Sequence, residues 1–185
     1  MNTPVKTRYG AAAQAFHWIS ALAVVLAWGT GLLRDSLPKG PIRSADMFTH
    51  VSAGEIVALL LVLRLVWRFV DAPPPALVSG RGRLADMAPK VVQGVIYLLL
   101  FALPAIGVSI VFAGGRELSL LGLIDLPSPW VKDRELGHAL KTLHEWMAHS
   151  LVALAALHAA SALAHHFRFK DDTLRRMLPA LGAKA

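Results

Sequence analysis

Long blocks of apolar residues alternate with short polar connections along this chain of 185 residues. The block from Ala11 to Leu33 contains no Asp, Glu, Lys or Arg, and neither does the block at 91–113. Uncharged runs of about 18 or more residues have the length of a helix that crosses a bilayer. The first block leads into Arg34-Asp35 rather than a small-residue cleavage site, so we interpret it as a retained membrane helix and not as a signal peptide.

Two further blocks, at 47–70 and 140–167, are apolar but less uniform. Glu55 interrupts the first of them, and Arg64 and Arg68 lie in its last two turns, where long cationic side chains reach the headgroups. This block stops at Asp71-Ala-Pro-Pro-Pro75, because consecutive prolines cannot continue a helix. The pattern therefore predicts an all-α fold, an integral membrane four-helix bundle that occupies residues 1–185 as a single domain.

The connections between the blocks indicate the orientation. Twelve of the 19 Lys and Arg residues lie on the side of the two chain ends and of the 71–90 connection, and seven lie on the other side. Cytoplasmic segments carry the excess of Lys and Arg, so we expect both termini in the cytoplasm and the chain in the bacterial inner membrane. The longest connection, 114–139, is expected to lie along the outer membrane surface.

Composition agrees with a membrane protein and narrows the chemistry. Hydrophobic residues make up 55% of the chain, charged residues 17%, and the mean hydropathy is +0.52. No cysteine is present, which excludes disulfides, cysteine-ligated iron–sulfur clusters and covalently attached c-type haem. The net charge of +7 is scattered between the apolar blocks, so it indicates contact with membrane lipid and not with nucleic acid.

Eight histidines are an unusual number for so apolar a chain, because an imidazole in hydrocarbon is costly without a partner. With both termini inside, His17 and His158 fall near the inner level, and His50 and His144 near the outer level. His144 and His158 are 14 residues apart on one helix, which is about 40° short of four turns and roughly 21 Å along the axis. Two stacked haem b groups, each between a histidine pair, are therefore predicted.

Each of these histidines has a simpler alternative role. A single histidine in a membrane helix is more often a packing or proton-handling residue than a haem ligand. A histidine-bearing ion or proton transporter without haem is a corresponding alternative for the whole chain, although only Glu55 and Glu145 supply carboxylates near its helices. His138 is expected at the interface, and His149 is expected to hydrogen-bond locally.

Residues around the histidines suggest supporting roles. Gly54 lies one turn after His50 and leaves room for a flat porphyrin. Arg64 and Arg68 either neutralise haem propionates or extend to the lipid headgroups. His165 either delivers protons to a quinone or anchors the helix end, as His166 beside it does. Glu55 is a proton carrier, a hydrogen-bond partner of a ligand, or a protonated carboxyl in a polar pocket.

A set of short motifs, in this order, is similar to the bacterial cytochrome b561 family over nearly the whole chain, and within it to the type that oxidises superoxide and reduces ubiquinone. The motifs are Phe16-His17-Trp18, His50-Val51-Ser52 with Gly54, the segment Arg64 to Arg68, Leu103-Pro104, Leu143-His144-Glu145, Leu157-His158-Ala159-Ala160, Ala164-His165-His166 and the segment Lys170 to Leu174. The resemblance implies two bis-histidine haems, ligated by His17 with His158 and by His50 with His144. Glu55 is an unusual residue at its place in this family.

The resemblance also implies an activity. Superoxide at the outer face would give up electrons, the two haems would carry them, and ubiquinone would collect two electrons and two protons. Outer cations would attract the anionic substrate or serve as ordinary loop charges; they are Arg116, Lys132, Arg134 and Lys141. The alternative function is that of a cytochrome b subunit that passes electrons between quinone and a redox protein partner, a dehydrogenase or hydrogenase.

Overall fold

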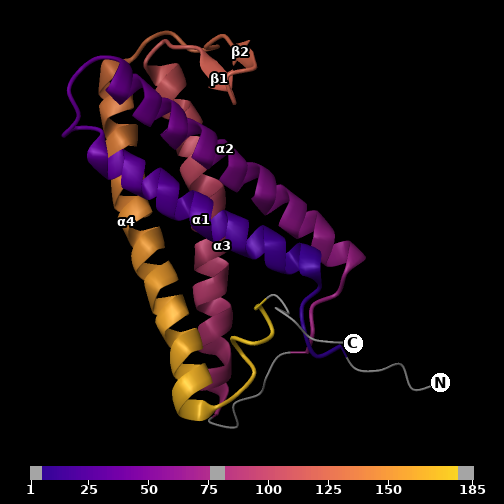
Figure 1. Cartoon of the computed structure of the whole chain (residues 1–185). Helices are drawn as coiled ribbons and strands as arrows, with labels where there is room; N and C mark the ends of the chain where they lie inside the picture. Colours follow the sequence, from indigo (N-terminus) through magenta and orange to yellow (C-terminus); the bar gives the residue numbers. More distant parts are fainter. Residues whose placement is uncertain (1–5, 76–81, 179–185) are drawn as a thin grey trace.

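Four long helices dominate the computed structural model, which describes residues 6–75 and 82–178 (Figure 1). The elements in chain order are α1 (Ala11–Leu33), α2 (Pro41–Val70), α3 (Arg83–Ala113), β1 (Leu118–Leu120), β2 (Ile124–Leu126), α4 (Arg134–Ala164) and η1, a short π-helix (His165–Phe169). The predicted largely helical fold is thereby confirmed. The first predicted helix has the bounds of α1, whereas α2, α3 and α4 begin six to eight residues earlier than the apolar blocks.

The early helix starts have local causes. Gly40, with φ of +136°, changes the chain direction before α2, and Pro41 then occupies the first helical position, where a missing N–H costs nothing. At α4 the Asp133 carboxylate accepts a hydrogen bond from the Leu136 N–H at 3.0 Å and caps the helix. The hydrophobic pattern of the sequence identifies only the part of a helix that contacts lipid, so it does not predict polar first turns such as these.

The helices form two hairpins, α1 with α2 and α3 with α4, and the hairpins also contact one another through α2 with α3 and α1 with α4. One core cluster receives side chains from all four helices; its members are Ala23, Val57, Leu61, Leu99, Leu100, Leu103 and Leu151. Figure 1 shows the α1–α2 hairpin crossing the α3–α4 hairpin and diverging from it away from the β strands. The two hairpins therefore lie closest at the end that carries β1 and β2, which we call the hairpin end.

The connection after α3 is not purely irregular, which corrects the all-α expectation. β1 and β2 pair antiparallel, with Leu118 opposite Leu126 and Leu120 opposite Ile124. The turn between them uses left-handed backbone at Leu121 and Gly122, with φ of +50° and +72°. Such a short strand pair gives too weak a periodicity to be read from sequence.

Both described chain ends lie together at the opposite end, which we call the terminal end. The Tyr9 N–H donates to the Arg176 carbonyl at 3.2 Å, and Trp18 Nε1 donates to the Met177 carbonyl at 2.8 Å. Arg176 in turn donates to the Pro75 carbonyl at 2.6 Å. The segment after η1 thus folds back over the start of α1 and the first residues after α2.

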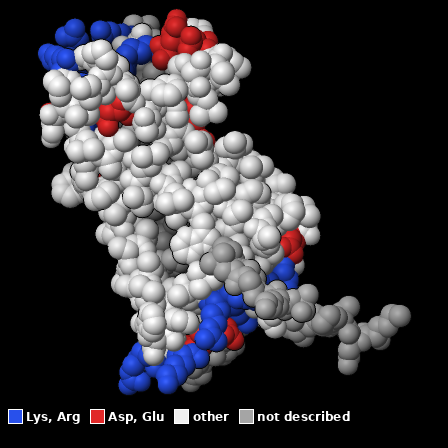
Figure 2. All heavy atoms as spheres, in the orientation of Figure 1, with Lys and Arg blue, Asp and Glu red and all other residues white. Residues whose placement is uncertain are grey.

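Three helical segments are long and apolar enough to cross a membrane: Ala11–Leu33, Asp86–Ala113 and Arg134–Phe169. Figure 2 shows Lys, Arg, Asp and Glu gathered at the two ends of the visible face, with uncharged residues between them. A middle zone without charge is what the hydrocarbon core of a bilayer requires. Three of the four predicted membrane helices thus have the length and composition that a crossing requires, while α2, with Glu55, Arg64 and Arg68, is not among them.

Candidate functional site

His50 and His144 meet near the hairpin end, from α2 and α4. Their ring centroids are 6.1 Å apart with an interplanar angle of 64°. Both residues are partly buried. Two imidazoles on opposite sides of one metal ion, with metal–nitrogen bonds of about 2 Å, have ring centroids roughly 6 Å apart. The observed spacing therefore fits a bis-imidazole metal centre.

A backbone carbonyl orients the His50 ring. His50 Nδ1 lies 2.7 Å from the Ala27 carbonyl oxygen on α1, a distance at which it donates its proton. His144 Nδ1 is buried near the Leu103 backbone on α3 and makes no hydrogen bond of ordinary geometry with the described residues. A ring that donates from Nδ1, as His50 does, keeps its lone pair on Nε2, which is the arrangement of a metal-ligating histidine held by a backbone carbonyl.

Glycines give the two rings their room. A Cβ on Gly31 would lie 3.3 Å from His50 Cε1, and a Cβ on Gly107 would lie 3.6 Å from His144 Cε1. At Gly54, one turn after His50, a Cβ would meet nothing within 4 Å. The open space predicted beside Gly54 is thus present, and the residues at this level fit a flat porphyrin between α2 and α4.

The second predicted pair is less closely assembled. His17 on α1 is partly buried, His158 on α4 is exposed, and their rings make no contact, although the two side chains interact electrostatically. The two helices that carry them belong to different hairpins, and these diverge here (Figure 1). The structure therefore brings the first pair together and leaves the second pair apart.

Arg64 on α2 accompanies the second pair. Its Nη2 lies 3.5 Å from His17 Nδ1, at the limit of a hydrogen bond, and its guanidinium also interacts with His158. Its Cζ lies 5.4 Å from the centroid of the Tyr97 ring, a cation–π distance. Arg68, one turn later, is exposed. Arg64 thus points to the histidines, whereas Arg68 is placed as a headgroup contact would be.

His165 begins η1 and has a carboxylate partner that sequence did not reveal. Its Nδ1 lies 2.5 Å from Asp171 Oδ2, and the Thr173 N–H donates to Asp171 Oδ1 at 2.9 Å. Burial raises the pKa of Asp171, but the hydrogen bonds from His165 and Thr173 outweigh it and lower the pKa to about 2. The carboxylate therefore stays ionised and holds the His165 ring in one orientation.

The remaining histidines have separate partners. The Trp28 Nε1–H on α1 donates to His149 Nδ1 on α4 at 3.2 Å, so the predicted local bond of His149 is instead a bond between helices. His166 packs edge-on against the Phe167 ring. His138 is exposed near the start of α4, as expected of an interfacial residue. Among the described residues, no group of three His, Cys, Asp or Glu could hold a metal ion.

The four candidate outer cations differ in their surroundings. Arg116, Lys132 and Arg134 are exposed at the hairpin end, as a surface that attracts an anion requires. Lys141 forms ion pairs with Asp35 at 3.5 Å and with Glu145 at 3.3 Å, so its charge is partly neutralised. The first three are therefore better placed than Lys141 to attract a soluble anion.

Glu55 fastens the β hairpin to α2. Its Oε2 accepts a hydrogen bond from the Leu121 N–H at 2.9 Å, and Gly122 packs against the Phe48 ring. Its Oε1 is buried and makes no hydrogen bond with the described residues. Of the roles considered from sequence, the structure gives this residue a hydrogen-bonding one, toward the hairpin backbone.

Comparison with known proteins agrees with this geometry. The family model for prokaryotic cytochrome b561 matches residues 8–180. Cytochrome b561 homolog 2 of Escherichia coli K12 is 36% identical over 179 residues, 96% of this chain and 93% of its own length. Cytochrome b561 homolog 1 of the same organism is 34% identical over 167 residues, covering 88% of this chain and 92% of its own length. A protein of Yersinia pestis named probable superoxide oxidase CybB is 32% identical over 172 residues, 93% of this chain and 96% of its own length.

The match spans both histidine pairs and all four long helices. The relatives are matched over almost their whole lengths, so the likeness concerns the complete fold and not one motif. The chain therefore belongs to the prokaryotic cytochrome b561 family, whose members are membrane electron-transfer proteins with b-type haem.

Proposed function

We propose that this protein is a cytochrome with two haem b groups that transfers electrons across the bacterial inner membrane, oxidising superoxide at the outer face and reducing ubiquinone. The observation that carries the proposal is the His50–His144 pair, with ring centroids 6.1 Å apart and His50 Nδ1 bonded to a backbone carbonyl. An imidazole in an apolar helix interface is costly without a partner, and an iron between these two rings would satisfy both.

The second haem is assigned to His17 and His158. These residues lie toward the terminal end, roughly 21 Å along α4 from the level of His144. Arg64 is placed to pair with a propionate there, since it already interacts with both histidines. An imidazole that accepts at Nδ1 carries its proton on Nε2, so Arg64 has to leave His17 Nδ1 when His17 ligates through Nε2.

Four membrane-spanning helices fit this role better than three. Both described chain ends lie at the terminal end, which requires an even number of crossings. Counting α2 with the three apolar segments gives four. The charges of α2 support this, because Glu55 faces the β hairpin and Arg64 faces histidines, so neither is exposed to hydrocarbon alone. We place the terminal end in the cytoplasm, in keeping with the Lys and Arg distribution.

The reaction balances with one quinone for two superoxide anions. Each superoxide loses one electron and leaves as dioxygen, and ubiquinone gains two electrons and two protons to become ubiquinol. Haem supplies a one-electron carrier at each level when bound. Arg116, Lys132 and Arg134 draw the anion to the hairpin end, and their effect should weaken at high ionic strength.

His165 is assigned to the quinone. It lies at the terminal end, seven residues after His158, and Asp171 holds its Nδ1. This leaves Nε2 to hold or donate a proton toward a bound quinone oxygen. A single π-helical turn, such as η1, also occurs often at functional sites.

Superoxide is chosen as donor because the Yersinia pestis relative is named for its oxidation. The alternative is a cytochrome b subunit that receives electrons from a partner dehydrogenase or hydrogenase. Purified protein, given a superoxide source and a soluble ubiquinone analogue, should reduce the quinone at a rate that superoxide dismutase abolishes. Quinone reduction only after a soluble dehydrogenase is added would support the alternative.

The haem content of the purified protein tests whether the two histidine pairs bind haem. The reduced-minus-oxidised spectrum should contain b-type bands from two haems per chain, and His50→Ala and His158→Ala should each lose one of them. His138→Ala, which removes an exposed histidine, is the matched control and should keep both. A colourless protein after expression with ample haem would refute the proposal.

A further inference from the structure

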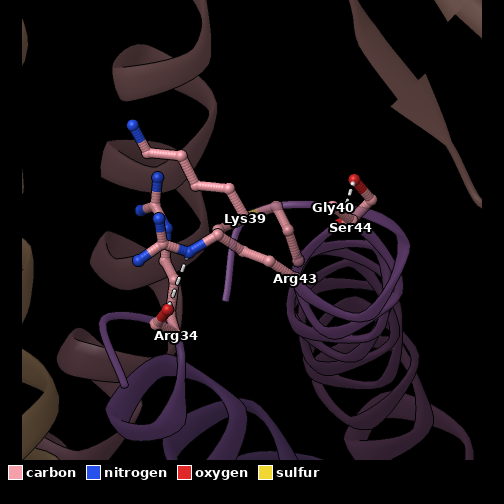
Figure 3. A pocket seen from close by; sticks show the side chains of 6 residues that line it. Arg34, Lys39, Gly40, Arg43 and Ser44 are labelled. Atoms are coloured by element: carbon pink, nitrogen blue, oxygen red, sulfur yellow. Dashed lines mark hydrogen bonds between the residues drawn. The ribbon is translucent and has the colours of Figure 1, made fainter. Parts of the chain in front are cut away.

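A cavity of about 330 Å³ opens at the corner between α1 and α2, at the hairpin end (Figure 3). Its lining consists of Arg34, Lys39, Gly40, Arg43, Ser44 and Met47. In Figure 3 the side chains of Arg34, Lys39 and Arg43 extend toward one another, and their cationic ends gather in one area. Three cations and no carboxylate line the cavity, so it suits an anion.

The local ion pairs leave this positive charge largely uncompensated. Arg43 Nε donates to the Arg34 carbonyl at 2.9 Å, which fixes the guanidinium over the corner. Its Nη2 lies 3.6 Å from Asp35 Oδ1, but the Asp35 side chain is 73% exposed and is shared with Lys141 of α4. An exposed shared carboxylate screens only weakly. The α2 N-terminus at Gly40 has no side-chain cap either, and its free N–H groups add to the positive potential.

The cavity lies on the hairpin-end side of the His50–His144 pair. Arg43 precedes His50 by seven residues, which is about 20° short of two turns and about 10 Å along α2, so both are on one face. Met47 lies between them, and on α1 Arg34 follows by three residues the glycine that contacts the His50 ring. The cations thus stand above this histidine pair on both helices.

We propose that Arg34 and Arg43, with Lys39, bind the two propionate carboxylates of the haem held by His50 and His144. The inference rests on the proposed haem function. A haem b carries both carboxylates on one edge, and in a membrane protein they need cations to offset their desolvation. Guanidinium groups bind carboxylates through two parallel hydrogen bonds, and the 10 Å step along α2 corresponds to the reach from an iron to that edge.

A phospholipid phosphate is the competing occupant. It shares the anionic oxygens, and the neighbouring Leu33 and Ile42 side chains, 56% and 62% exposed, could contact acyl chains. The alignment with His50 favours the propionates, because a lipid site has no reason to follow the helix face that carries this partly buried histidine. The two occupants are separated by measuring bound haem and bound phospholipid in the same samples.

The test compares Arg43→Gln and Arg34→Gln with Arg116→Gln, which removes an exposed charge at the same end outside the cavity. Haem content, the rate of haem transfer to an excess of a haem-scavenging apoprotein, and the two midpoint potentials are measured on purified protein. Each cavity variant should lose one haem about tenfold faster, since a charge-assisted hydrogen bond is removed. The midpoint potential of that haem should fall, because a nearby cation favours the reduced form. Arg116→Gln should match the parent in haem content, in the rate of haem release and in both midpoint potentials.

The possible results distinguish a failure of the propionate site from a failure of the proposed haem function. If both cavity variants release haem at the parent rate and keep both potentials, the propionate site is refuted, even if two haems are present. If the variants instead lose copurifying phospholipid phosphorus, the cavity is a lipid site. If the parent protein binds no haem, the proposed function itself fails. Arg43→Lys keeps the charge and controls for folding, and it should restore most of the retention.

Discussion

Replacing Gly31 with alanine should weaken the haem at the His50–His144 level without affecting the other haem. The new Cβ would lie 3.3 Å from His50 Cε1 and 3.4 Å from His50 Nδ1. These distances are shorter than an ordinary van der Waals contact, so the imidazole has to move by a few tenths of an ångström. The move pulls Nδ1 away from the Ala27 carbonyl, which it now meets at 2.7 Å.

The expected loss of haem affinity in Gly31→Ala depends on which effects of the new methyl group differ between the haem-bound and haem-free protein. Alanine raises helix stability by roughly 0.5–1 kcal/mol, but it does so with and without haem and cancels from the binding free energy. Crowding of a packed site costs about 1–3 kcal/mol, and loss of the orienting hydrogen bond costs about 1 kcal/mol. Since the ring can relax partly, we expect haem binding at this level to weaken by about 1–2 kcal/mol, roughly 5–30-fold.

Gly29→Ala provides the matched control. It makes the same substitution in the same helix, two residues earlier, where a Cβ meets nothing within 4 Å. Both variants are purified, their haem-to-protein ratio is measured, and haem transfer to a scavenging apoprotein is followed at the b-type absorption band. One kinetic phase should accelerate in Gly31→Ala, and neither phase should change in Gly29→Ala.

Equal haem retention in the two alanine variants would refute the reasoning. It would mean that the His50 ring is not held at a metal in the position described, or that this helix contact is absent in the membrane. Acceleration of both phases would mean that the substitution disturbs the whole helix packing and not one ligand.

Asp171→Asn should lower thermal stability above about pH 4. The pKa of the native Asp171 carboxyl is lowered from 3.8 to about 2, so the stability difference from the parent should shrink as the pH falls from about 4 through 2. A difference that is as large at about pH 2 as at about pH 5 would contradict an ionised Asp171 carboxylate beside His165. Glu55→Ala should speed amide hydrogen exchange at Leu121 and across the β hairpin, since its acceptor is lost, while Glu55→Gln should preserve the protection. Identical exchange in both Glu55 variants would show that the carboxylate does not hold the hairpin.

Sequence predicted the elements that lipid contact dictates and missed those that polar contacts dictate. The bounds of α1 follow from its uncharged run, because the helix contains no Asp, Glu, Lys or Arg. The first turns of α2 and α4 depend instead on Pro41 and on the Asp133 cap, which hydropathy does not register. The β hairpin depends on a long-range bond from Glu55, and a bond between distant residues leaves no periodic trace in either segment.

Some residues of the candidate site could be predicted from the sequence, and others could not. Helical geometry was sufficient to place His50 and His144 at one level, and the structure brings their rings together. Gly31 and Gly107 were not identified, although a glycine within a membrane helix is a usable signal of close approach. Asp171 could not have been assigned to His165, because their contact depends on the left-handed backbone of Lys170, with φ of +54°.

The two histidine levels differ in how much the fold organises them beforehand. At the hairpin end the two helical hairpins converge, a backbone carbonyl orients His50, and binding a cofactor there requires little rearrangement. Toward the terminal end the hairpins diverge, His158 is exposed, and Arg64 occupies the Nδ1 side of His17. Ligation by His17 and His158 would therefore have to draw α1 and α4 together. The free energy that this closure costs would make the binding free energy of the second haem less favourable. The same closure would bury the divergent part of the helix interface, so the proposed second haem would also complete the packing of the four helices.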